Sequence, residues 1–344
     1  MKKIINSIIL IFFVIDSISA QLDNNESMEK AGTAAAQFLK IPFDSKGSAM
    51  GNTGVSMPGT IGSSYWNPAT IAAVEQNEFG ILSAKWLADI NIDFFGFILA
   101  TKKFGNIGFN VFSLNTPEDD VTTIYQPDGT GEKWKASDIS ISISYGRKLS
   151  NNFSIGSNLK FIQQKIWHTS AYTLAGDIGV LFITPFKSTR LGASLSNYGG
   201  KMKLIGRDQK LSIDPDPINQ GNVEFVNGSY ETNHFDLPLL FRVGISNEVI
   251  KAKYTEITYS MDAIYPSDGV EYLGIGIEAN LLNQYKLRIG IPYFTNDNSV
   301  ANVTLGLGVD KFLKNTKSRV GFDYSLIDFG PLGVVQKIYL NFNY

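Results

Sequence analysis

Residues 138–146 read "DISISISYG", and the two kinds of side chain in this stretch alternate without a break. In an extended strand, successive side chains point to opposite faces. One face therefore carries Ile139, Ile141, Ile143 and Tyr145, and the other carries Ser140, Ser142, Ser144 and Gly146. A period of two predicts a β-strand with one apolar and one polar face.

The same alternation recurs almost to the end of the chain and predicts fourteen strands. We place them at 78–87, 90–101, 105–114, 137–147, 152–165, 171–183, 189–198, 235–246, 254–264, 270–279, 285–293, 301–312, 317–327 and 334–344. Short turns alternate with long polar connections at 115–135 and 199–234. An even number of strands of about ten residues, joined in this way, is typical of an all-β, antiparallel outer-membrane β-barrel.

Charged side chains stand on the polar faces of these strands. They are costly in lipid, so we expect them in the lumen, where they would form a polar network that holds a plugged interior. Its predicted members are Arg242, Glu256, Asp262, Glu278, Arg288, Arg319 and Asp323.

The composition agrees with a barrel but also with a large soluble β-protein. The 344 residues are 44% hydrophobic and 18% charged, with 32 glycines. A soluble secreted β-sandwich or propeller would alternate too. The apolar face persists through all fourteen predicted strands, and the segment 335–344, "VQKIYLNFNY", ends in an aromatic residue, as the final strands of barrel proteins do. Both features favour the barrel.

The first twenty residues are predicted to be a signal peptide. Lys2 and Lys3 precede an apolar run that ends in Ser19 and Ala20, so cleavage is expected before Gln21. Removing these residues changes the formal net charge from −2 to −3. A chain of this charge is not expected to bind nucleic acid.

Residues 21–77 are predicted to form an N-terminal helix and plug segment, followed by the barrel over 78–344. Apolar residues near helical spacing indicate one short amphipathic helix within 25–41. Glycines then crowd the chain at 47, 51, 54, 59 and 62, as suits a segment folded inside a lumen.

The sequence offers little for catalysis. It contains no cysteine and only two histidines, His168 and His234, which lie far apart. The acidic residues at 118–120 and the stretch "PDGTGE" at 127–132 are interpreted as solvated loops. We therefore predict no catalytic, cofactor or metal site, and a protein that is not an enzyme.

The stretch 47–72, "GSAMGNTGVSMPGTIGSSYWNPATIA", resembles the N-terminal signature of the PorV/PorQ family of outer-membrane proteins, relatives of the FadL transporters of hydrophobic compounds. Further matches include "LPLLFRVGIS" at 237–246 and "FDYSLIDFGPLG" at 322–333. The resemblance implies a fourteen-stranded barrel with a plug, serving type IX protein secretion. Its implied partners are the outer-membrane lipid bilayer and the translocon, cargo or attachment-complex proteins.

Two functions follow as hypotheses. For secretion, partners would bind at the cell surface through aromatic residues of the long loops, namely Tyr125, Trp134, Phe225 and Tyr230. The alternative is a FadL-like channel for hydrophobic small molecules, whose lumen would be lined by Met50, Val55, Met57, Ile61, Tyr65 and Trp66. A soluble secreted β-protein with a binding role is the third possibility.

The motif "SSYWNPA" at 63–69 is interpreted as a latch that joins plug to barrel. Pro68 lacks a backbone donor and restrains the residue before it. Tyr65 and Trp66 are expected to wedge against the lumen wall, and Asn67 is expected to cap a short helical turn.

Overall fold

The computed structural model describes residues 30, 32–101, 103–186, 189–215, 218, 225–295, 300–313, 316 and 318–344. The predicted signal peptide lies outside this part of the chain. No helix among the described residues is long and apolar enough to cross a membrane.

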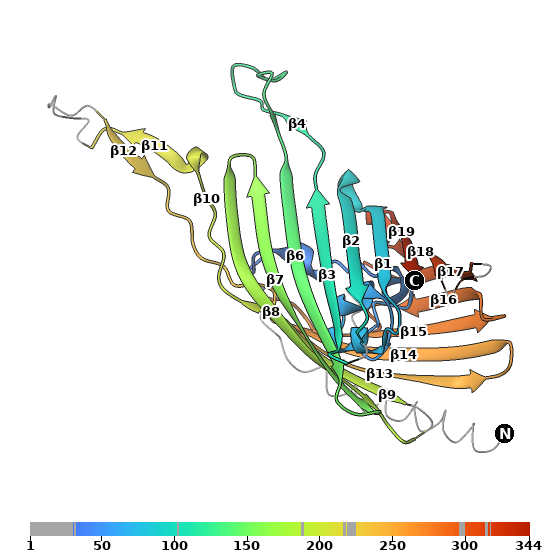
Figure 1. Ribbon diagram of the computed structural model, residues 1–344. Helices are drawn as coiled ribbons and strands as arrows, with labels where there is room; N and C mark the ends of the chain where they lie inside the picture. The colour runs from blue at the N-terminus through green and yellow to red at the C-terminus, as the bar shows by residue number, and fades with distance from the viewer. Residues whose placement is uncertain are drawn as a thin grey trace.

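Fourteen antiparallel strands form a closed barrel (Figure 1). Closure is made by β1 pairing with β19, over eight residue pairs. The strands are β1 Glu78–Lys85, β2 Asn91–Leu99, β3 Asn106–Asn115, β6 Ala136–Lys148, β7 Phe153–Ile166, β8 Thr169–Ile183, β9 Arg190–Gly199, β13 Leu240–Lys251, β14 Thr255–Pro266, β15 Tyr272–Leu281, β16 Tyr285–Ile291, β17 Thr304–Phe312, β18 Arg319–Asp328 and β19 Val334–Asn343. The predicted fold class is confirmed.

Each predicted strand overlaps an observed one, and the largest displacement is at β13. The prediction began this strand at residue 235, whereas it begins at Leu240. Pro238 explains the difference, because it has no N–H to donate to a neighbouring strand. The alternating pattern upstream of this proline belongs to the loop.

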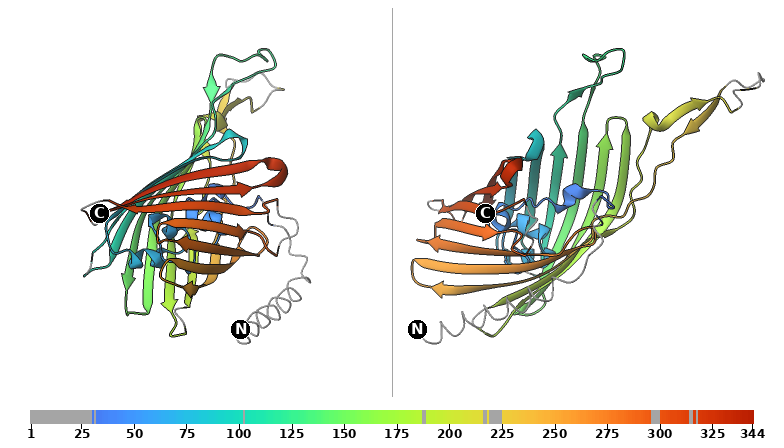
Figure 2. Two further views of the ribbon diagram at one scale, coloured as in Figure 1. Left: turned by 90° about the vertical axis from the view of Figure 1, so that its right-hand side faces the viewer. Right: turned by 180° about the vertical axis from the view of Figure 1, so that it is seen from behind.

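Two hairpins extend beyond one end of the barrel (Figures 1 and 2). The first is formed by β4 Asp119–Asp120 and β5 Lys133–Trp134, and the second by β11 Lys210–Ile213 and β12 Val226–Ser229. A two-residue strand, β10 Ile205–Gly206, joins the edge of β8. Since long loops of outer-membrane barrels are extracellular, this end faces outside the cell.

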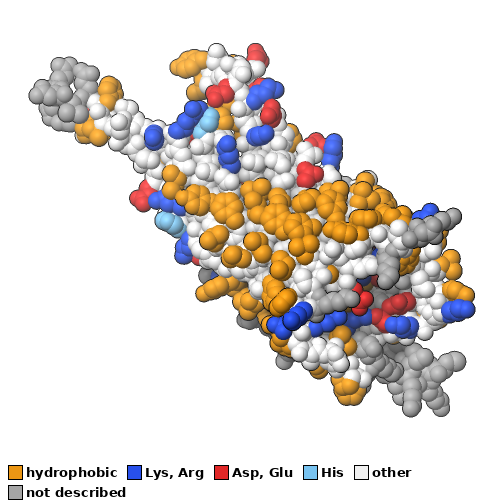
Figure 3. Space-filling model, in the orientation of Figure 1, with side chains coloured by type: hydrophobic (Ala, Val, Ile, Leu, Met, Phe, Trp, Pro, Cys, Tyr) orange, Lys and Arg blue, Asp and Glu red, His pale blue; other side chains and the backbone are white. Residues whose placement is uncertain are grey.

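The pleat of the strands turns apolar side chains outward. In β6, Ile143 is 56% exposed while its neighbour Ser144 is fully buried in the lumen. Repeated around the barrel, this arrangement produces the apolar band in Figure 3. A closed barrel with such an outer band belongs in a bacterial outer membrane.

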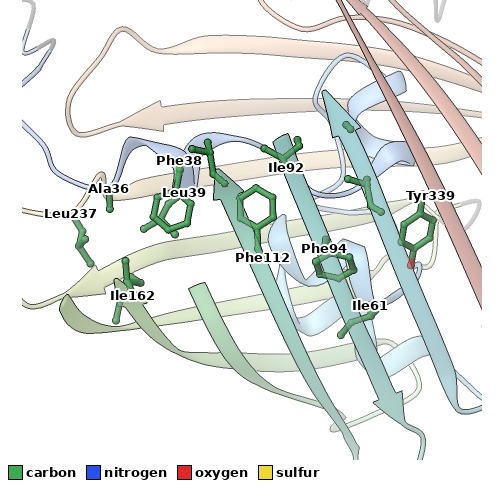
Figure 4. Close-up of a cluster of buried hydrophobic side chains, with 14 of the residues drawn as sticks. Ala36, Phe38, Leu39, Ile61, Ile92, Phe94, Phe112, Ile162, Leu237 and Tyr339 are labelled. Carbon is green, nitrogen blue, oxygen red and sulfur yellow. The ribbon is translucent and has the colours of Figure 1, made fainter. Parts of the chain in front are cut away.

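Strands β1 to β3 depart from the pattern because large apolar side chains point into the lumen as well as outward. Leu82, Phe94 and Phe112 belong to a buried cluster with residues of the N-terminal segment. Figure 4 shows Phe94 and Phe112 pointing inward, toward Ile61 and Phe38 of that segment. The rings of Phe43 and Phe94 stack with centroids 4.5 Å apart. The lumen is therefore partly a hydrophobic core, and the N-terminal segment is anchored there.

Residues 32–77 lie inside the barrel and form the plug (Figures 1 and 2). They contain η1 Gln37–Lys40, the helix α2 Ser45–Ala49, η2 Ile61–Tyr65 and η3 Pro68–Ala73, where η denotes a 3-10 helix. The helix predicted within 25–41 is corrected in its described part to the four residues of η1, because Ala36 adopts a left-handed backbone with φ of 50°. Residues 25–29 and 31 of that prediction lie outside the described part.

Inward-facing glycines let the plug approach the strand backbone. A Cβ atom at Gly156 would collide with the backbone of Pro68 and Ala69, and one at Gly276 would collide with Met50. We call this set the glycine belt: Gly80, Gly96, Gly108, Gly146, Gly156, Gly179, Gly192, Gly274, Gly276, Gly290 and Gly306. Side chains at these positions would fill the space that the plug occupies.

Gly156→Ala is expected to destabilise the folded barrel by about 1–3 kcal/mol, the usual cost of overpacking a filled interior. The reason is that the backbone of Pro68 and Ala69 stands where the new methyl group must go. The free energy of unfolding, measured by urea titration in detergent micelles, provides the check.

Gly176→Ala is the matched control, because a Cβ there meets its nearest neighbour, the Asn158 carbonyl oxygen, at an ordinary 3.5 Å. Equal stability of the two variants would contradict a close fit between plug and wall at Gly156.

Candidate functional site

Polar wall residues hold the plug by its backbone. The buried carboxylate of Asp262, on β14, accepts hydrogen bonds from the backbone N–H groups of Gly54 (2.6 Å) and Val55 (2.9 Å). Hydrogen bonds to a charged group contribute about 1.5–3 kcal/mol each. Asp262 is thus a strong point of attachment.

Two further charged wall residues act in the same way from the other side of the barrel. The Lys337 ammonium donates to the Pro42 carbonyl (2.7 Å) and to the Ser48 hydroxyl (3.0 Å). Glu78 accepts a hydrogen bond from the backbone N–H of Ile61 (2.9 Å). Neutral wall side chains that also bond to the plug include Asn106, Asn158, Gln164, Ser194, Ser246 and Thr304.

The seven residues predicted as one lumen network are divided among several groups. Arg288 bridges Glu278 (2.6 Å) and Asp323 (2.5 Å), and Lys46 of the plug adds a contact to Glu278 at 3.4 Å. Arg319 instead pairs with Asp310 at 3.5 Å. Asp262 bonds to the plug, Arg242 contacts aromatic rings, and Glu256 forms no salt bridge within the described part of the chain. These residues form separate groups because they lie at different positions along their strands.

Trp66, of the predicted latch, points mainly into the plug. Its Nε1–H donates to Asp44 at 2.9 Å, and its ring lies against Gly47 and Gly54. Asp44 also caps α2 by accepting from the backbone N–H of Gly47 at 2.8 Å. Trp66 therefore ties several turns of the plug together.

Tyr65 and Trp66 meet the wall chiefly at Arg242. The guanidinium carbon lies 4.9 Å from the centroid of the Tyr65 ring and 5.8 Å from that of Trp66. The Tyr65 hydroxyl donates to the Lys40 carbonyl at 2.7 Å. Burial raises the pKa of the Tyr65 phenol to about 12, so the group remains a neutral donor.

Asn67 connects plug and wall directly. Its Oδ1 accepts from the backbone N–H of Ala69 (2.9 Å), which caps η3, and its Nδ2 donates to the carbonyls of Val55 and Val180 at 2.8 Å each. Pro68 opens η3 as its first residue. One side chain thus caps a helical turn, joins two plug segments and reaches β8.

Above the plug, on its extracellular side, is a cavity of about 190 Å³. Arg242 and Leu240 of β13 form part of its wall. The aromatic residues that line it are Tyr65, Trp66, Trp86, Tyr272, Tyr293 and Phe329. Of the six residues predicted to line a channel, only Tyr65 and Trp66 line this cavity. The other four, Met50, Val55, Met57 and Ile61, are buried elsewhere in the plug.

Sequence reasoning missed Trp86, Tyr272, Tyr293 and Phe329, which lie at the extracellular ends of different strands or just beyond them. Aromatic residues at strand ends are also expected at the membrane interface. The strand pattern gave no reason to assign these four to the lumen.

On the periplasmic side of the plug is a larger, polar hollow of about 890 Å³. Its charged lining comprises Glu75, Glu78, Lys103, Arg147, Lys148 and Arg319. The plug thus stands between an aromatic cavity and a polar mouth.

The four predicted partner-binding residues do not form one surface. Tyr125 (94% exposed) and Trp134 belong to the β4–β5 hairpin, whereas Phe225 and Tyr230 belong to the β11–β12 hairpin. No group of three or more histidine and acidic side chains in the described part of the chain could hold a metal ion.

No protein-family model matches the sequence, and no curated protein matches it either. The fold is similar to those of solved outer-membrane proteins. The toluene transporter TodX of Pseudomonas putida is 12% identical with a TM-score of 0.53, over 86% of this chain and 96% of TodX. The toluene transporter TbuX of Ralstonia pickettii is 12% identical with a TM-score of 0.52, over 87% of this chain and 97% of TbuX.

A Pseudomonas aeruginosa FadL homologue is similar at 11% identity and a TM-score of 0.50, over 88% of this chain and 98% of that protein. These comparisons show a FadL-like barrel fold. They give no support specific to the PorV/PorQ family.

Asp262→Ala is expected to loosen the plug, because the N–H groups of Gly54 and Val55 lose their acceptor. Two lost bonds of this kind correspond to a destabilisation of about 3 kcal/mol or more. Conductance of the purified barrel in planar bilayers should rise. Asp310→Ala is the control, since the ion pairs of Asp310 are with Lys286 and Arg319 of the wall. The same conductance increase in both variants would contradict a specific role of Asp262.

Trp66→Ala is expected to lower the free energy of unfolding by about 3–5 kcal/mol, as for other large buried aromatic residues. Stability is lost because the substitution leaves an empty space over Gly47 and Gly54 and removes the hydrogen bond to Asp44. Faster proteolysis within 44–67 should accompany it. Trp134→Ala, in the exposed hairpin, should change neither quantity. Wild-type stability of Trp66→Ala would argue against the latch.

Proposed function

We propose that this protein is a non-enzymatic outer-membrane channel that admits small hydrophobic molecules past its N-terminal plug. The observation that carries the proposal is the aromatic cavity on the extracellular side of the plug. It lies at the extracellular ends of the strands, on the side from which a molecule outside the cell would enter.

The size and lining of the cavity suit a molecule of about one aromatic ring. A cavity of roughly 150 Å³ lined by apolar side chains holds benzene in another protein. The cavity here, at about 190 Å³, is slightly larger. Six aromatic residues would provide edge and face contacts, and these favour aromatic ligands.

Passage further inward requires the plug to shift. The segment 50–57 lies directly against the glycine belt and is held by Asp262 and Ser246 through hydrogen bonds. Such bonds can be exchanged for bonds to water as the segment moves, whereas the hydrophobic anchor at Phe38 and Phe43 stays packed against β2 and β3. We propose displacement of 50–57 as the opening step.

The structural similarities support this channel better than the type IX secretion role implied by the PorV/PorQ resemblance, since two of the similar proteins are named toluene transporters. The secretion role remains a prediction. A deletion strain distinguishes the two: loss of hydrocarbon uptake with normal export of proteins bearing a C-terminal sorting domain supports the channel, and the reverse result overturns it.

Leu240→Trp is expected to lower the initial rate of toluene uptake by about tenfold, which corresponds to about 1.4 kcal/mol of lost binding. The larger side chain would fill the cavity from β13. Uptake of labelled toluene by cells whose only such channel is this protein measures the effect.

The control is Leu305→Trp, which adds the same side chain on the exposed outer face of β17. Undiminished uptake by Leu240→Trp would contradict entry through the cavity, provided that both variants reach the outer membrane in equal amounts.

A further inference from the structure

A groove of about 300 Å³ lies on the extracellular side of the barrel, between the base of the β4–β5 hairpin and the turn joining β7 to β8. It is separate from the lumen cavity. Three lysines, Lys133, Lys135 and Lys165, line it together with the indole rings of Trp134 and Trp167. Glu118, Glu132, Ser137 and His168 complete the lining.

The groove opens on the outer face of the wall, just beyond the apolar band. Lys165 is exposed and shares the outward face of β7 with Phe161. Four residues separate them, or about 13 Å along a strand and about 10 Å of height at the usual tilt. Lys165 pairs in register with Ser137 of β6, which places Lys135 at a similar level. This is the level of lipid headgroups.

The lysines are only weakly engaged by the protein itself. Lys133 lies 3.9 Å from Asp120, and Lys135 lies 3.9 Å from Glu118, with all four side chains more than half exposed. Exposed pairs at this distance contribute little. Lys165 forms no salt bridge with any residue that the structure describes. All three ammonium groups can therefore bind an external anion.

Trp167 has an unusual backbone for its residue type. It stands first in the two-residue turn between β7 and β8, with φ of 50°, a conformation that favours glycine or asparagine. The centroid of its ring lies 4.3 Å from that of His168, and its backbone N–H donates to the Lys135 carbonyl. The strained turn holds a large amphipathic ring at the interface, where tryptophan packs favourably against lipid headgroups.

A second sector of the extracellular rim has an acidic character. At the extracellular ends of β1, β2 and β18, the outer face carries Asp89, Asp93 and Asp328, with Lys85 beside them. Figure 3 shows lysine and arginine side chains above the apolar band near a histidine, with acidic side chains among them. A general attraction to the membrane would not require such a concentration.

We propose that this groove binds the phosphate of a phosphorylated lipid headgroup in the outer leaflet. The three lysines would surround the phosphate, Trp134 and Trp167 would pack against the rest of the headgroup, and the acyl chains would continue along the apolar band. Such binding would fix the base of the β4–β5 hairpin to the membrane surface. The proposal depends on the barrel and its membrane, and is independent of what the lumen transports.

The test uses the full-length barrel in nanodiscs, with bisphosphorylated lipid A as the probe. The triple variant K133Q/K135Q/K165Q should retain less than about a tenth of wild-type affinity, since losing three charge contacts costs more than about 1.4 kcal/mol. Native mass spectrometry counts the bound lipids. Equal affinity of the triple variant and the wild type would overturn the proposal.

The matched control is K85Q/K148Q/K311Q, which removes the same charge from exposed lysines elsewhere on the barrel, including one at the same rim. It should bind lipid A as the wild type does. An equal loss in both variants would overturn the groove as the site. Faster migration of unboiled samples on a denaturing gel verifies that each variant is folded.

Two further arms identify the ligand. Dephosphorylated lipid A should bind the wild type and the triple variant with the same affinity. Excess inorganic phosphate should not displace bound lipid A from the wild type. Full displacement by inorganic phosphate would contradict a lipid as the ligand and would indicate a free anion instead. Trp167→Gly should lower affinity without lowering stability, because glycine relieves the turn while the ring is lost. Unchanged affinity would contradict the role given to the ring.

Discussion

Closure of the backbone hydrogen-bond network is the constraint on which the whole structure depends. No water reaches the hydrocarbon core of a membrane, so every strand must have a partner on both sides. Here the pairing of β1 with β19 removes the last two open edges. Once the sheet is closed, its alternating side chains can only face lipid or lumen, and the polar lumen must then be filled or hydrated.

The plug fills that lumen by matching small residues on the wall. The glycine belt lets the plug backbone lie against the strands, and wall side chains such as Asp262 and Lys337 satisfy its exposed N–H and carbonyl groups. Regular secondary structure would leave fewer backbone groups free for the wall. This explains why the plug is built from single turns and why Asn67, with bonds to two plug segments and to β8, occupies a central place.

The attachment is uneven, and the difference has a functional meaning for the proposed channel. On the side of β1 to β3 the plug is held mainly by packed aromatic rings, while on the side of β13 to β17 it is held mainly by hydrogen bonds. Apolar contacts weaken as soon as surfaces part, but hydrogen bonds can be exchanged with water. The aromatic cavity lies next to this second side, beside Arg242. A ligand held there would contact Tyr65, Trp66 and the wall together.

The sequence by itself determined the fourteen strands, their inward and outward faces and the break at Pro68, because these depend on a period of two and on the chemistry of single residues. It also singled out Asn67 as a helix cap. Only the tertiary structure decided which charges meet, since Glu278, Arg288 and Asp323 come from three different strands whose register sets their heights. The same holds for the lumen cavity, whose residues lie far apart in the chain, and for the lysine groove, which joins the segments 118–137 and 165–168. The predicted N-terminal helix is reduced in its described part to the four residues of η1, because Ala36 adopts a left-handed backbone and donates its N–H to Gln164 of β7.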